Sequence, residues 1–295
     1  MARRIVAIDW GTSSLRGARL DAQGAVLDER ASLQGILNVP PGGFEAVFQA
    51  QFGDWLSPDT LCLISGMAGS RQGWREAPYC ACPSGASDIA AALAWIAPGR
   101  IAIVPGLNCE RDGAPDVMRG EETQIFGALD MLGLADALFV LPGTHSKWAE
   151  VRGGRVERFS TAMTGETYAL LRHHSILART LPSEDGALQD AAFDAGVERA
   201  LRSASLLQSA FTVRTLALFE RSTPDELASY LSGLVIGEEL RAQGSLVGRR
   251  VHVIGNDALT QRYQRALACA GAQGVAVGAQ ATWRGLWNIA RSLPE

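Results

Sequence analysis

Short apolar runs separated by turn-forming residues open the chain. Ile5–Ile8 is an unbroken apolar run of strand length, and a polar, glycine-containing stretch at residues 9–14 ends it. Leu15–Leu20 and Ala25–Glu29 follow as two further strand candidates. Between them, Asp21-Ala22-Gln23-Gly24 has Asp first and Gly last, the residue choice of a type I turn. The pattern predicts three consecutive strands joined by tight turns.

A similar pattern recurs halfway along the chain. Leu138–Leu141, Lys147–Val151 and Val156–Phe159 are strand candidates, and turns at residues 142–146 and 152–155 join them. Each copy reads strand, Gly-Thr turn, strand, glycine turn, strand. We interpret the two copies as an internal duplication, with one copy opening each of two domains. Two unrelated hairpins are the alternative.

Strands and helices alternate in the rest of the chain. The further strand candidates are Leu61–Ser65, Ile101–Pro105 and Val251–Ile254, and the predicted helices are Glu121–Leu132, Glu166–Arg179, Leu188–Ser205, Leu207–Glu220, Pro224–Gln243, Asp257–Ala270 and Ala279–Arg291. Strands mixed with long helices indicate an α/β architecture. We expect two domains, at residues 1–130 and 131–295, with the final helix packing back on the first.

Composition and charge narrow the class of protein. The 295 residues are 47% hydrophobic and 20% charged, which is typical of a globular chain long enough for two domains. The net charge of -4 gives no sign of a nucleic-acid or anionic-membrane surface. No apolar run approaches the roughly 18 residues of a membrane span, and the start of the chain lacks a signal-peptide pattern. We therefore expect a cytoplasmic enzyme, made without a leader.

The first turn has the residues of a phosphate site. Gly11 allows close approach of a ligand to the backbone, while Thr12, Ser13 and Ser14 offer hydroxyl and N–H groups. Asp9, at the carboxyl end of the first strand, would act on phosphate through Mg²⁺ or its bound water. A polar turn that merely joins two strands is the alternative.

The second turn contains the chain's only lysine. Of the 27 basic residues, Lys147 alone is not arginine, and it directly follows the turn that contains Gly143, Thr144 and Ser146. A lysine ammonium is a compact point charge that arginine does not imitate. We therefore predict that this turn and Lys147 bind phosphate; the alternative is a partly exposed structural lysine.

A third glycine follows the strand at residues 251–254. Gly255 and Asn256 lie between that strand and a predicted helix. The glycine would let an adenosine lie against the backbone, and the helix start favours a nearby phosphate. Many strand-to-helix turns have this pattern, so it is weak by itself.

Two adjacent carboxylates begin the helix at residues 121–132. Glu121 or Glu122 would act as general base for a sugar hydroxyl, and we prefer Glu121. Their alternative role is a favourable interaction with the helix dipole.

A loop rich in glycine, arginine and aromatic residues spans Ser65–Tyr79. Trp74 and Tyr79 would stack on the apolar face of a sugar, Arg71 would bind a carboxylate bidentately, and Glu76 would bind hydroxyl groups. Loops of this composition are often binding sites, but the pattern does not say which residues contact the substrate.

These motifs, in this order, resemble the actin-like sugar kinase superfamily. Asp9–Arg16 resembles its first phosphate motif, Leu141–Trp148 its second, and Val253–Asp257 its adenosine motif. More narrowly, G-M-A-G-S-R-Q-G-W-R-E-A-P-Y, M-R-G-E-E-T-Q, L-P-G-T-H-S-K-W and T-A-M-T-G-E (Thr161–Glu166) are similar to the 2-dehydro-3-deoxygalactonokinase family. The likeness covers essentially the whole chain.

The resemblance implies a fold of two ribonuclease-H-like domains with ATP and Mg²⁺ held in a cleft between them. It implies phosphorylation of the terminal hydroxyl of 2-dehydro-3-deoxy-D-galactonate, in galactonate breakdown. Its site residues then also include Arg16, His145 and Gly165 for ATP and Ser70 and Arg119 for the sugar acid.

One departure leaves alternatives open. Many kinases of this superfamily have Asp as the base, whereas this chain has Glu at the corresponding helix start. A kinase for another sugar or sugar acid, a polyphosphate or nucleotide phosphatase of the same fold, and a non-catalytic nucleotide-binding module remain alternatives. The oligomeric state is also open, and a homodimer is one possibility.

Overall fold

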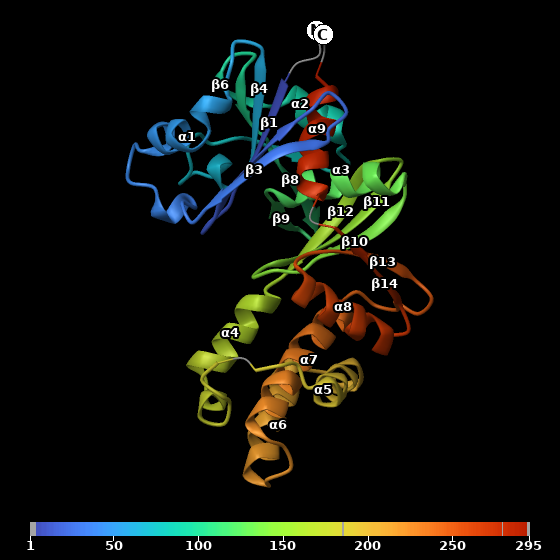
Figure 1. Cartoon of the computed structure of the whole chain (residues 1–295). Coiled ribbons are helices and arrows are strands. Elements are labelled where there is room, and N and C mark those ends of the chain that lie inside the picture. The colour runs from blue at the N-terminus through green and yellow to red at the C-terminus, as the bar shows by residue number, and fades with distance from the viewer. Residues whose placement is uncertain (1–3, 185, 279, 294–295) are drawn as a thin grey trace. The chain divides into compact units, whose positions relative to one another are not determined.

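The computed structural model describes residues 4–184, 186–278 and 280–293. Its contacts divide the chain into two compact units (Figure 1). Unit 1 comprises residues 1–137, 149–160 and 278–295, and unit 2 comprises residues 138–148 and 161–277. The boundary predicted at residue 130 falls inside helix α3 (Glu121–Leu132), so the units divide later, after Ala137.

The main sheet of unit 1 has the strand order β3-β2-β1-β4-β7-β6. Its strands are β1 (Arg4–Trp10), β2 (Leu15–Leu20), β3 (Val26–Ser32), β4 (Thr60–Gly66), β6 (Ala94–Ala97) and β7 (Ile101–Ile103). The first three form the predicted antiparallel meander, and β4 pairs parallel with β1. The Gly24 N–H donates to the Asp21 carbonyl (3.1 Å), which confirms the predicted turn.

The second sheet repeats this order as β12-β11-β10-β13-β14. Its strands are β10 (Ala137–Leu141), β11 (Ser146–Arg152), β12 (Arg155–Ala162), β13 (Arg250–Ile254) and β14 (Gln273–Val277). As in unit 1, a parallel strand, β13, lies beside the first strand of the meander. The internal repeat predicted from the sequence is therefore confirmed. The boundary between the units falls within β11 and β12.

Unit 1 also holds a small sheet that the sequence analysis missed. It has the order β5-β8-β9, with β5 (Tyr79–Ala81), β8 (Gly106–Arg111) and β9 (Ala114–Met118). Two residues, Arg119 and Gly120, separate the end of β9 from the start of α3.

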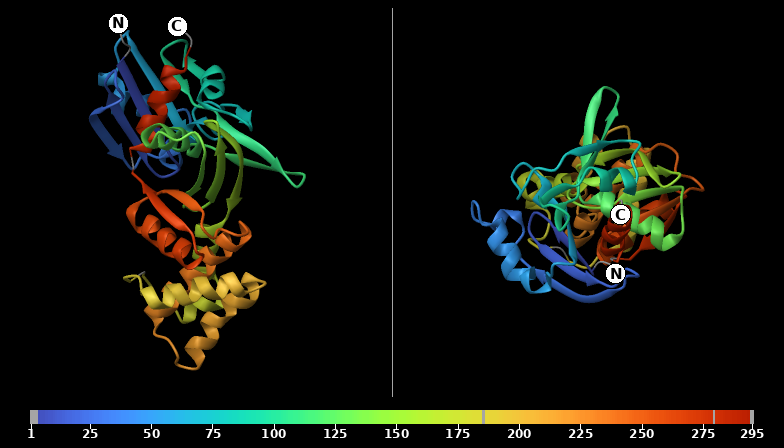
Figure 2. Two further views of the ribbon diagram at one scale, coloured as in Figure 1. Left: turned by 90° about the vertical axis from the view of Figure 1, so that its right-hand side faces the viewer. Right: turned by 90° about the horizontal axis from the view of Figure 1, so that it is seen from above.

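The helices of unit 1 include the last one of the chain. They are α1 (Phe44–Phe52), α2 (Ala86–Ala91), α3 and α9 (Ala281–Arg291). Helix α9 packs against α3 and β1 (Figures 1 and 2). A Cβ at Gly127 would lie 1.8 Å from the Ala281 carbonyl oxygen, and one at Gly285 would lie 1.8 Å from that of Thr123. The two helix backbones therefore touch, which only glycine allows at these positions. The predicted start of this helix, residue 279, lies outside the described residues.

Unit 2 adds a helical segment between β12 and β13. The helices of this segment are α4 (Thr164–His174), α5 (Asp190–Arg202), α6 (Leu206–Leu218) and α7 (Pro224–Ala242), and α8 (Asp257–Cys269) follows β13. The predicted helix 166–179 is broken at Ser175, whose backbone is extended, and a 3₁₀ helix, Ile176–Arg179, follows. Helix α7 begins as predicted: Thr223 caps it and Pro224 occupies its first turn.

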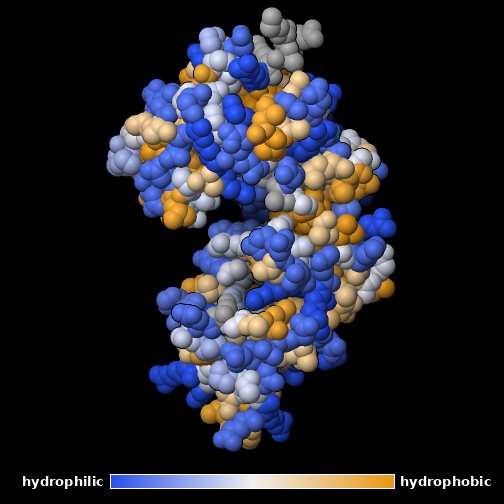
Figure 3. Space-filling model, viewed as in Figure 1, coloured by the Kyte–Doolittle hydropathy of each residue, from blue (hydrophilic) through white to orange (hydrophobic). Residues whose placement is uncertain are grey.

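Each unit has its own apolar core. In unit 1, Ile8, Trp10 and Phe48 lie in one cluster, and in unit 2, Val140, Val253 and Phe193 lie in another. On the face shown in Figure 3, hydrophobic residues form small groups among hydrophilic ones. Among the described residues, no helix combines the length and apolar character needed to cross a membrane.

Candidate active site

The first glycine turn joins β1 to β2 in unit 1. Asp9 and Arg16 face each other across this antiparallel pair, and Arg16 Nη2 donates to Asp9 Oδ2 over 2.5 Å. The Gly11 N–H donates to the Ser14 carbonyl (2.9 Å), which closes the turn. The three hydroxyl-bearing residues 12–14 are exposed. The predicted first phosphate motif is therefore a compact turn whose polar groups face solvent.

Residues 34–37 support this turn from one side. The N–H groups of Ile36 and Leu37 donate to the carbonyls of Gly11 (3.0 Å) and Thr12 (3.2 Å). A Cβ at Gly35 would lie 2.3 Å from the Ser13 backbone, so a larger residue would push the turn away. The turn is thus held by backbone contacts.

Glu122 is fully buried at the start of α3. Its Oε2 accepts from the Gly120 N–H (2.7 Å), and its Oε1 accepts from the Thr123 hydroxyl (3.0 Å). Burial raises the pKa of this carboxyl to about 8, and the neighbouring Glu121 charge adds to the rise. The Glu122 side chain is therefore held by hydrogen bonds at the start of the helix and is not exposed to solvent.

Glu121 is only partly buried, and it begins the helix beside the first turn. Its Oε2 accepts from the Arg119 N–H (2.9 Å). A Cβ at Gly120 would lie 3.4 Å from the Gly66 Cα, and one at Gly66 would lie 3.4 Å from Asp9 Oδ1. Because Gly66 ends β4 beside β1, the start of α3 and the end of β1 share one edge of the sheet. Glu121 and Asp9 are thereby brought to the same edge.

Arg119 connects the start of α3 to the predicted substrate loop. Its Nη2 donates to the Ala77 carbonyl (2.9 Å), and its guanidinium lies over the Tyr79 ring, 4.4 Å from the centroid. Its Nε and Nη1 are buried and have no hydrogen-bond partner among the described residues, and the same holds for Ser70 Oγ. Buried donors without partners cost free energy, so they mark a place where a ligand oxygen would be favourable.

The other loop residues lie in two settings. Arg71 and Glu76 pair on the surface (3.1 Å), with 88% and 61% of their side chains exposed. Trp74 packs instead against Trp10 and Phe48, with ring centroids 6.0 and 5.2 Å away. Trp74 also lines a pocket of about 500 Å³. The other residues lining this pocket are Ile36, Val39, Pro41, Gly42, Phe44, Glu45, Gln72 and Gly73.

The second glycine turn, in unit 2, docks on the start of α4. The N–H groups of Gly165 and Glu166 donate to the carbonyls of Gly143 (3.2 Å) and Thr144 (3.1 Å). A Cβ at Gly165 would lie 2.6 Å from the Gly143 oxygen, so this position requires glycine. His145 Nε2 lies 2.6 Å from Glu166 Oε2 at the exposed tip.

A buried carboxylate lies beneath this turn. Glu239 of α7 accepts at Oε1 from the Ser146 hydroxyl (2.7 Å) and the Trp148 indole N–H (2.6 Å). Its Oε2 accepts from the hydroxyls of Tyr263 (2.6 Å) and Thr164. Burial raises the pKa of Glu239, while these hydrogen bonds oppose the rise. The Ser146 side chain, predicted to face phosphate, therefore points into the unit.

Lys147 points the other way from its neighbours in β11. Side chains alternate along a strand, so Lys147 lies on the opposite face of the sheet from Ser146 and Trp148. It is 7% exposed, and its Nζ donates to Thr161 Oγ1 (2.7 Å). The sole lysine is thus held in one orientation.

The third predicted motif lies next to the second turn. A Cβ at Gly255 would lie 3.6 Å from both Pro142 Cδ and Thr260 Oγ1. Asn256 caps α8, because its Oδ1 accepts from the Leu259 N–H (2.9 Å). The Thr260 hydroxyl is buried without a hydrogen-bond partner among the described residues.

The structure thus groups the predicted residues by unit. Asp9, Arg16, Glu121 and the loop at residues 65–79 belong to unit 1, and the second turn, Lys147 and Gly255 belong to unit 2. The sequence analysis missed Glu239, Thr161, Thr164 and Tyr263 as parts of the site. The T-A-M-T-G-E motif pointed to the segment with the two threonines, whereas Glu239 lies in a helix without any motif.

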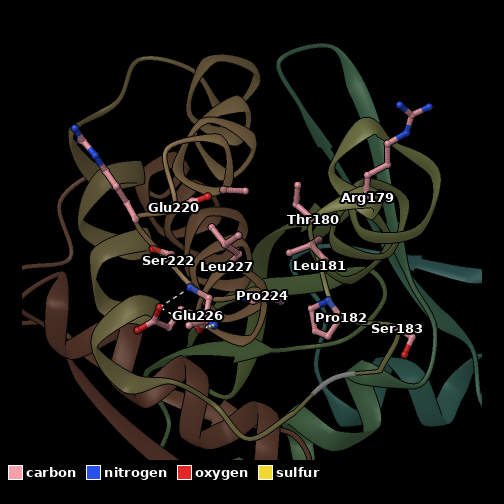
Figure 4. Close-up of a pocket in the computed structure, with 13 residues that line it drawn as sticks. Arg179, Thr180, Leu181, Pro182, Ser183, Glu220, Ser222, Pro224, Glu226 and Leu227 are labelled. Carbon is pink, nitrogen blue, oxygen red and sulfur yellow. Dashed lines mark hydrogen bonds between the residues drawn. The ribbon is translucent and has the colours of Figure 1, made fainter.

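A further pocket, of about 730 Å³, lies in the helical segment of unit 2 (Figure 4). Leu181 and Leu227 face each other across it, and the Arg179 side chain extends away from them. No residue predicted for the site lines this pocket. It is therefore separate from the groups described above.

Among the described residues, no three His, Cys, Asp or Glu side chains gather as a metal cage. Magnesium needs no such cage, since one or two carboxylates, water and substrate phosphates suffice. Asp9 fits that requirement: its side chain is 20% exposed, and Arg16 takes up Oδ2. Asp9 could therefore hold the ion directly or through water.

Known proteins of one family match this chain over nearly its whole length. Residues 9–289 match the 2-keto-3-deoxy-galactonokinase family. The 2-dehydro-3-deoxygalactonokinase of Escherichia coli (strain K12) is 34% identical over 99% of both chains. A probable 2-dehydro-3-deoxygalactonokinase of Rhizobium meliloti (strain 1021) is 38% identical over 97% of this chain and 96% of its own.

Solved structures give the same result. A Sinorhizobium meliloti protein assigned as a 2-dehydro-3-deoxygalactonokinase matches with a TM-score of 0.91 and 37% identity, over 97% of this chain and 98% of its own. The activator of 2-hydroxyisocaproyl-CoA dehydratase from Clostridium difficile, with bound ADPNP, shares the fold alone (TM-score 0.52, 11% identity, 98% and 95% of the two chains). The two-domain actin-like fold predicted from the sequence is confirmed. The chain belongs to the 2-keto-3-deoxygalactonokinase family.

Proposed function

We propose that this chain transfers the γ-phosphoryl group of ATP to the terminal hydroxyl of 2-dehydro-3-deoxy-D-galactonate. The observation that carries the proposal is the position of Glu121, a partly buried carboxylate beside the first glycine turn. It stands in a chain that matches the curated Escherichia coli kinase from end to end.

Glu121 is the proposed general base. The residue is partly exposed, whereas Glu122 is fully buried and its carboxylate accepts hydrogen bonds from Gly120 and Thr123. A base must reach the proton that it removes, so accessibility favours Glu121. Glu122 would then hold the helix start in place.

ATP use follows from membership of a kinase family, and each unit offers a turn for its phosphates. We assign phosphate binding to residues 11–14, Arg16, Gly143, Thr144, His145, the Ser146 backbone, Lys147 and Gly165. Gly255 and Asn256 would accommodate the adenosine. Phosphoryl transfer depends mainly on positioning and on offsetting negative charge, which suits N–H groups and one fixed ammonium.

Asp9 would hold Mg²⁺, directly or through water. When bound, the ion would neutralise charge on the phosphates. Arg16 holds the Asp9 carboxylate in place over 2.5 Å and so leaves Oδ1 for this role.

The loop at residues 65–79 would bind the sugar acid. The unpartnered Nε and Nη1 of Arg119 and the hydroxyl of Ser70 support a role in binding oxygen atoms. Tyr79, stacked on Arg119 and 43% exposed, would cover the substrate. Arg71 and Glu76 lie further out on the surface, and Trp74 would contribute one face of its ring.

ADP release in a coupled assay tests the proposal. The panel contains Mg-ATP with 2-dehydro-3-deoxygalactonate, its gluconate epimer, galactonate or no acceptor. We expect turnover with the galactonate-derived keto acid alone. Equal release without an acceptor would instead indicate a phosphatase of the same fold, and turnover with another sugar acid would correct the substrate. A cytoplasmic location and a homodimer remain predictions from the sequence.

A further inference from the structure

We infer that Glu239 is the positioning residue of the second phosphate turn: its carboxylate fixes β11 and the start of α4 in the arrangement that binds nucleotide. The inference rests on the proposed phosphate role of this turn. Glu239 itself lies below the turn and is 4% exposed, so its proposed role is to position the turn.

The network joins four elements through one side chain. Ser146 and Trp148 come from β11, Thr164 is the first residue of α4, Tyr263 lies in α8, and Glu239 lies in α7. These donors are separated from Glu239 by 24 to 93 positions in the sequence. A carboxylate has about four acceptor sites, and four donors fill them.

The ionised form of Glu239 suits this arrangement. The Trp148 N–H can only donate, so Oε1 must be an acceptor. The hydroxyls of Ser146, Thr164 and Tyr263 can turn their protons toward the remaining sites. Four hydrogen bonds converge on this one buried side chain, so the network links the segments that supply the donors.

The network also fixes the orientation of Lys147. Ser146 and Trp148, its two neighbours in β11, both face Glu239, which turns Lys147 to the opposite face of the sheet. There Lys147 donates to Thr161, three residues before the Thr164 that also binds Glu239. Lys147 and Thr161 therefore each lie close in sequence to residues that hydrogen-bond to Glu239.

The turn itself depends on the same contacts. Gly143 and Thr144 accept hydrogen bonds from the N–H groups of Gly165 and Glu166, directly after Thr164. If Thr164 shifts, α4 moves and the turn loses these two contacts. Glu239 thus acts on nucleotide binding through the backbone.

The test compares Glu239→Gln with Glu238→Gln. Glu238 is the adjacent carboxylate of α7, where it pairs with Arg241 (2.5 Å) outside the network. Gln retains the shape of Glu but removes the charge and turns two acceptor sites into donors. We expect the KM for ATP of Glu239→Gln to rise about tenfold, the equivalent of one hydrogen bond, with the KM for the keto acid unchanged. Glu238→Gln should behave as wild type.

Calorimetric titration with Mg-ADP gives a readout that needs no acceptor. The Kd of Glu239→Gln should rise by the same factor. If the wild-type chain phosphorylates no sugar acid, the proposed function fails, while the Mg-ADP titration still tests the role of Glu239. A lowered melting temperature with unchanged ADP affinity would overturn the inference and leave Glu239 a purely structural residue.

Milder variants cover the case in which Glu239→Gln does not fold. Tyr263→Phe and Thr164→Val each remove one donor and leave the carboxylate. We expect each to weaken Mg-ADP binding about threefold, as for loss of part of a hydrogen bond. Normal ADP affinity in both would also overturn the inference. In the double variant Ser146→Ala/Glu239→Gln, the loss of Mg-ADP affinity should not exceed that of Glu239→Gln alone, since both changes act through one contact.

Discussion

The two units repeat one sheet order but secure their glycine turns in different ways. In unit 1, backbone hydrogen bonds from Ile36 and Leu37 hold the turn, and a partly exposed pair, Asp9 with Arg16, closes its base. In unit 2, the turn likewise accepts two backbone hydrogen bonds, from Gly165 and Glu166, but a buried carboxylate, Glu239, binds four donors beneath it. The two units therefore share the path of the backbone at the turn but differ in the side chains that support it.

The charges beside the two turns also differ. Unit 1 places carboxylates, Asp9 and Glu121, at the edge of its sheet, which suits metal binding and proton removal. Unit 2 places an ammonium, Lys147, next to its turn, which suits phosphate. The comparison suggests that each unit contributes a different part of the chemistry, and the variants below test this division.

Glu121→Gln should have the largest effect. Loss of a general base lowers kcat by about 10²- to 10⁴-fold, while Mg-ADP binding should stay normal. Steady-state rates and calorimetry of the same sample check both statements. If Glu122→Gln were the inactive variant and Glu121→Gln the active one, the assignment of the base would be off by one residue.

Lys147→Met should have the next largest effect, on the other unit. Removing one fixed charge-stabilising donor lowers kcat by about 10²- to 10³-fold. Lys147→Arg should not restore the rate, because a guanidinium is larger and planar. Thr161→Val is the control: it removes the hydrogen-bond partner of Lys147 but keeps the ammonium, so its loss should be smaller. A near-normal rate for Lys147→Met would contradict the phosphate role.

Glu239→Ala and Arg16→Ala compare the two supports directly. Glu239→Ala leaves the Trp148 N–H and three hydroxyls without their acceptor, so the free energy of unfolding should fall by about 3 kcal/mol. Arg16→Ala removes a partly exposed pair and should cost about 0.5 kcal/mol. Urea unfolding without nucleotide measures both. Equal losses would mean that the two turns are supported to the same degree.

The pH dependence of stability should reveal the buried Glu122. Its pKa of about 8 in the folded chain lies above the ordinary value of 4.5. Between these values the folded chain keeps a proton that the unfolded chain releases, so stability falls as the pH rises toward 8. Between pH 6 and pH 8 the free energy of unfolding should fall by about 2 kcal/mol from this group. Glu122→Gln should remove this part of the slope; parallel curves for the two proteins would contradict it.

Local patterns were enough to predict the repeated meanders. Each strand follows its neighbour after a short turn with Gly or Asp, so pairing partners lie close in sequence. The small sheet was not predicted, because β5 is three residues long and pairs with β8, some 27 positions later. Pairing between distant segments leaves no local pattern.

The residues of the candidate site that could be proposed from sequence are those in or next to glycine turns. Glycine turns and the sole lysine stood out by composition, whereas Glu239 lies in a helix and its partners come from distant segments. Trp74 was expected at a sugar, but its main contacts are Trp10 and Phe48. Sequence alone does not show whether an aromatic side chain packs in the core or faces a ligand.

The contact of α3 with α9 has a consequence for the synthesis of the protein. Gly127 and Gly285 let the two helix backbones touch, yet they lie more than half the chain apart. A ribosome that has completed β1, α3 and all of unit 2 has still not made the helix that packs against β1. Until residues 281–291 are made, β1 and α3 lack the helix that packs against both of them. Unit 1 of the nascent chain should therefore stay open to protease and to chaperones until residues 281–291 have been made and can pack against β1 and α3.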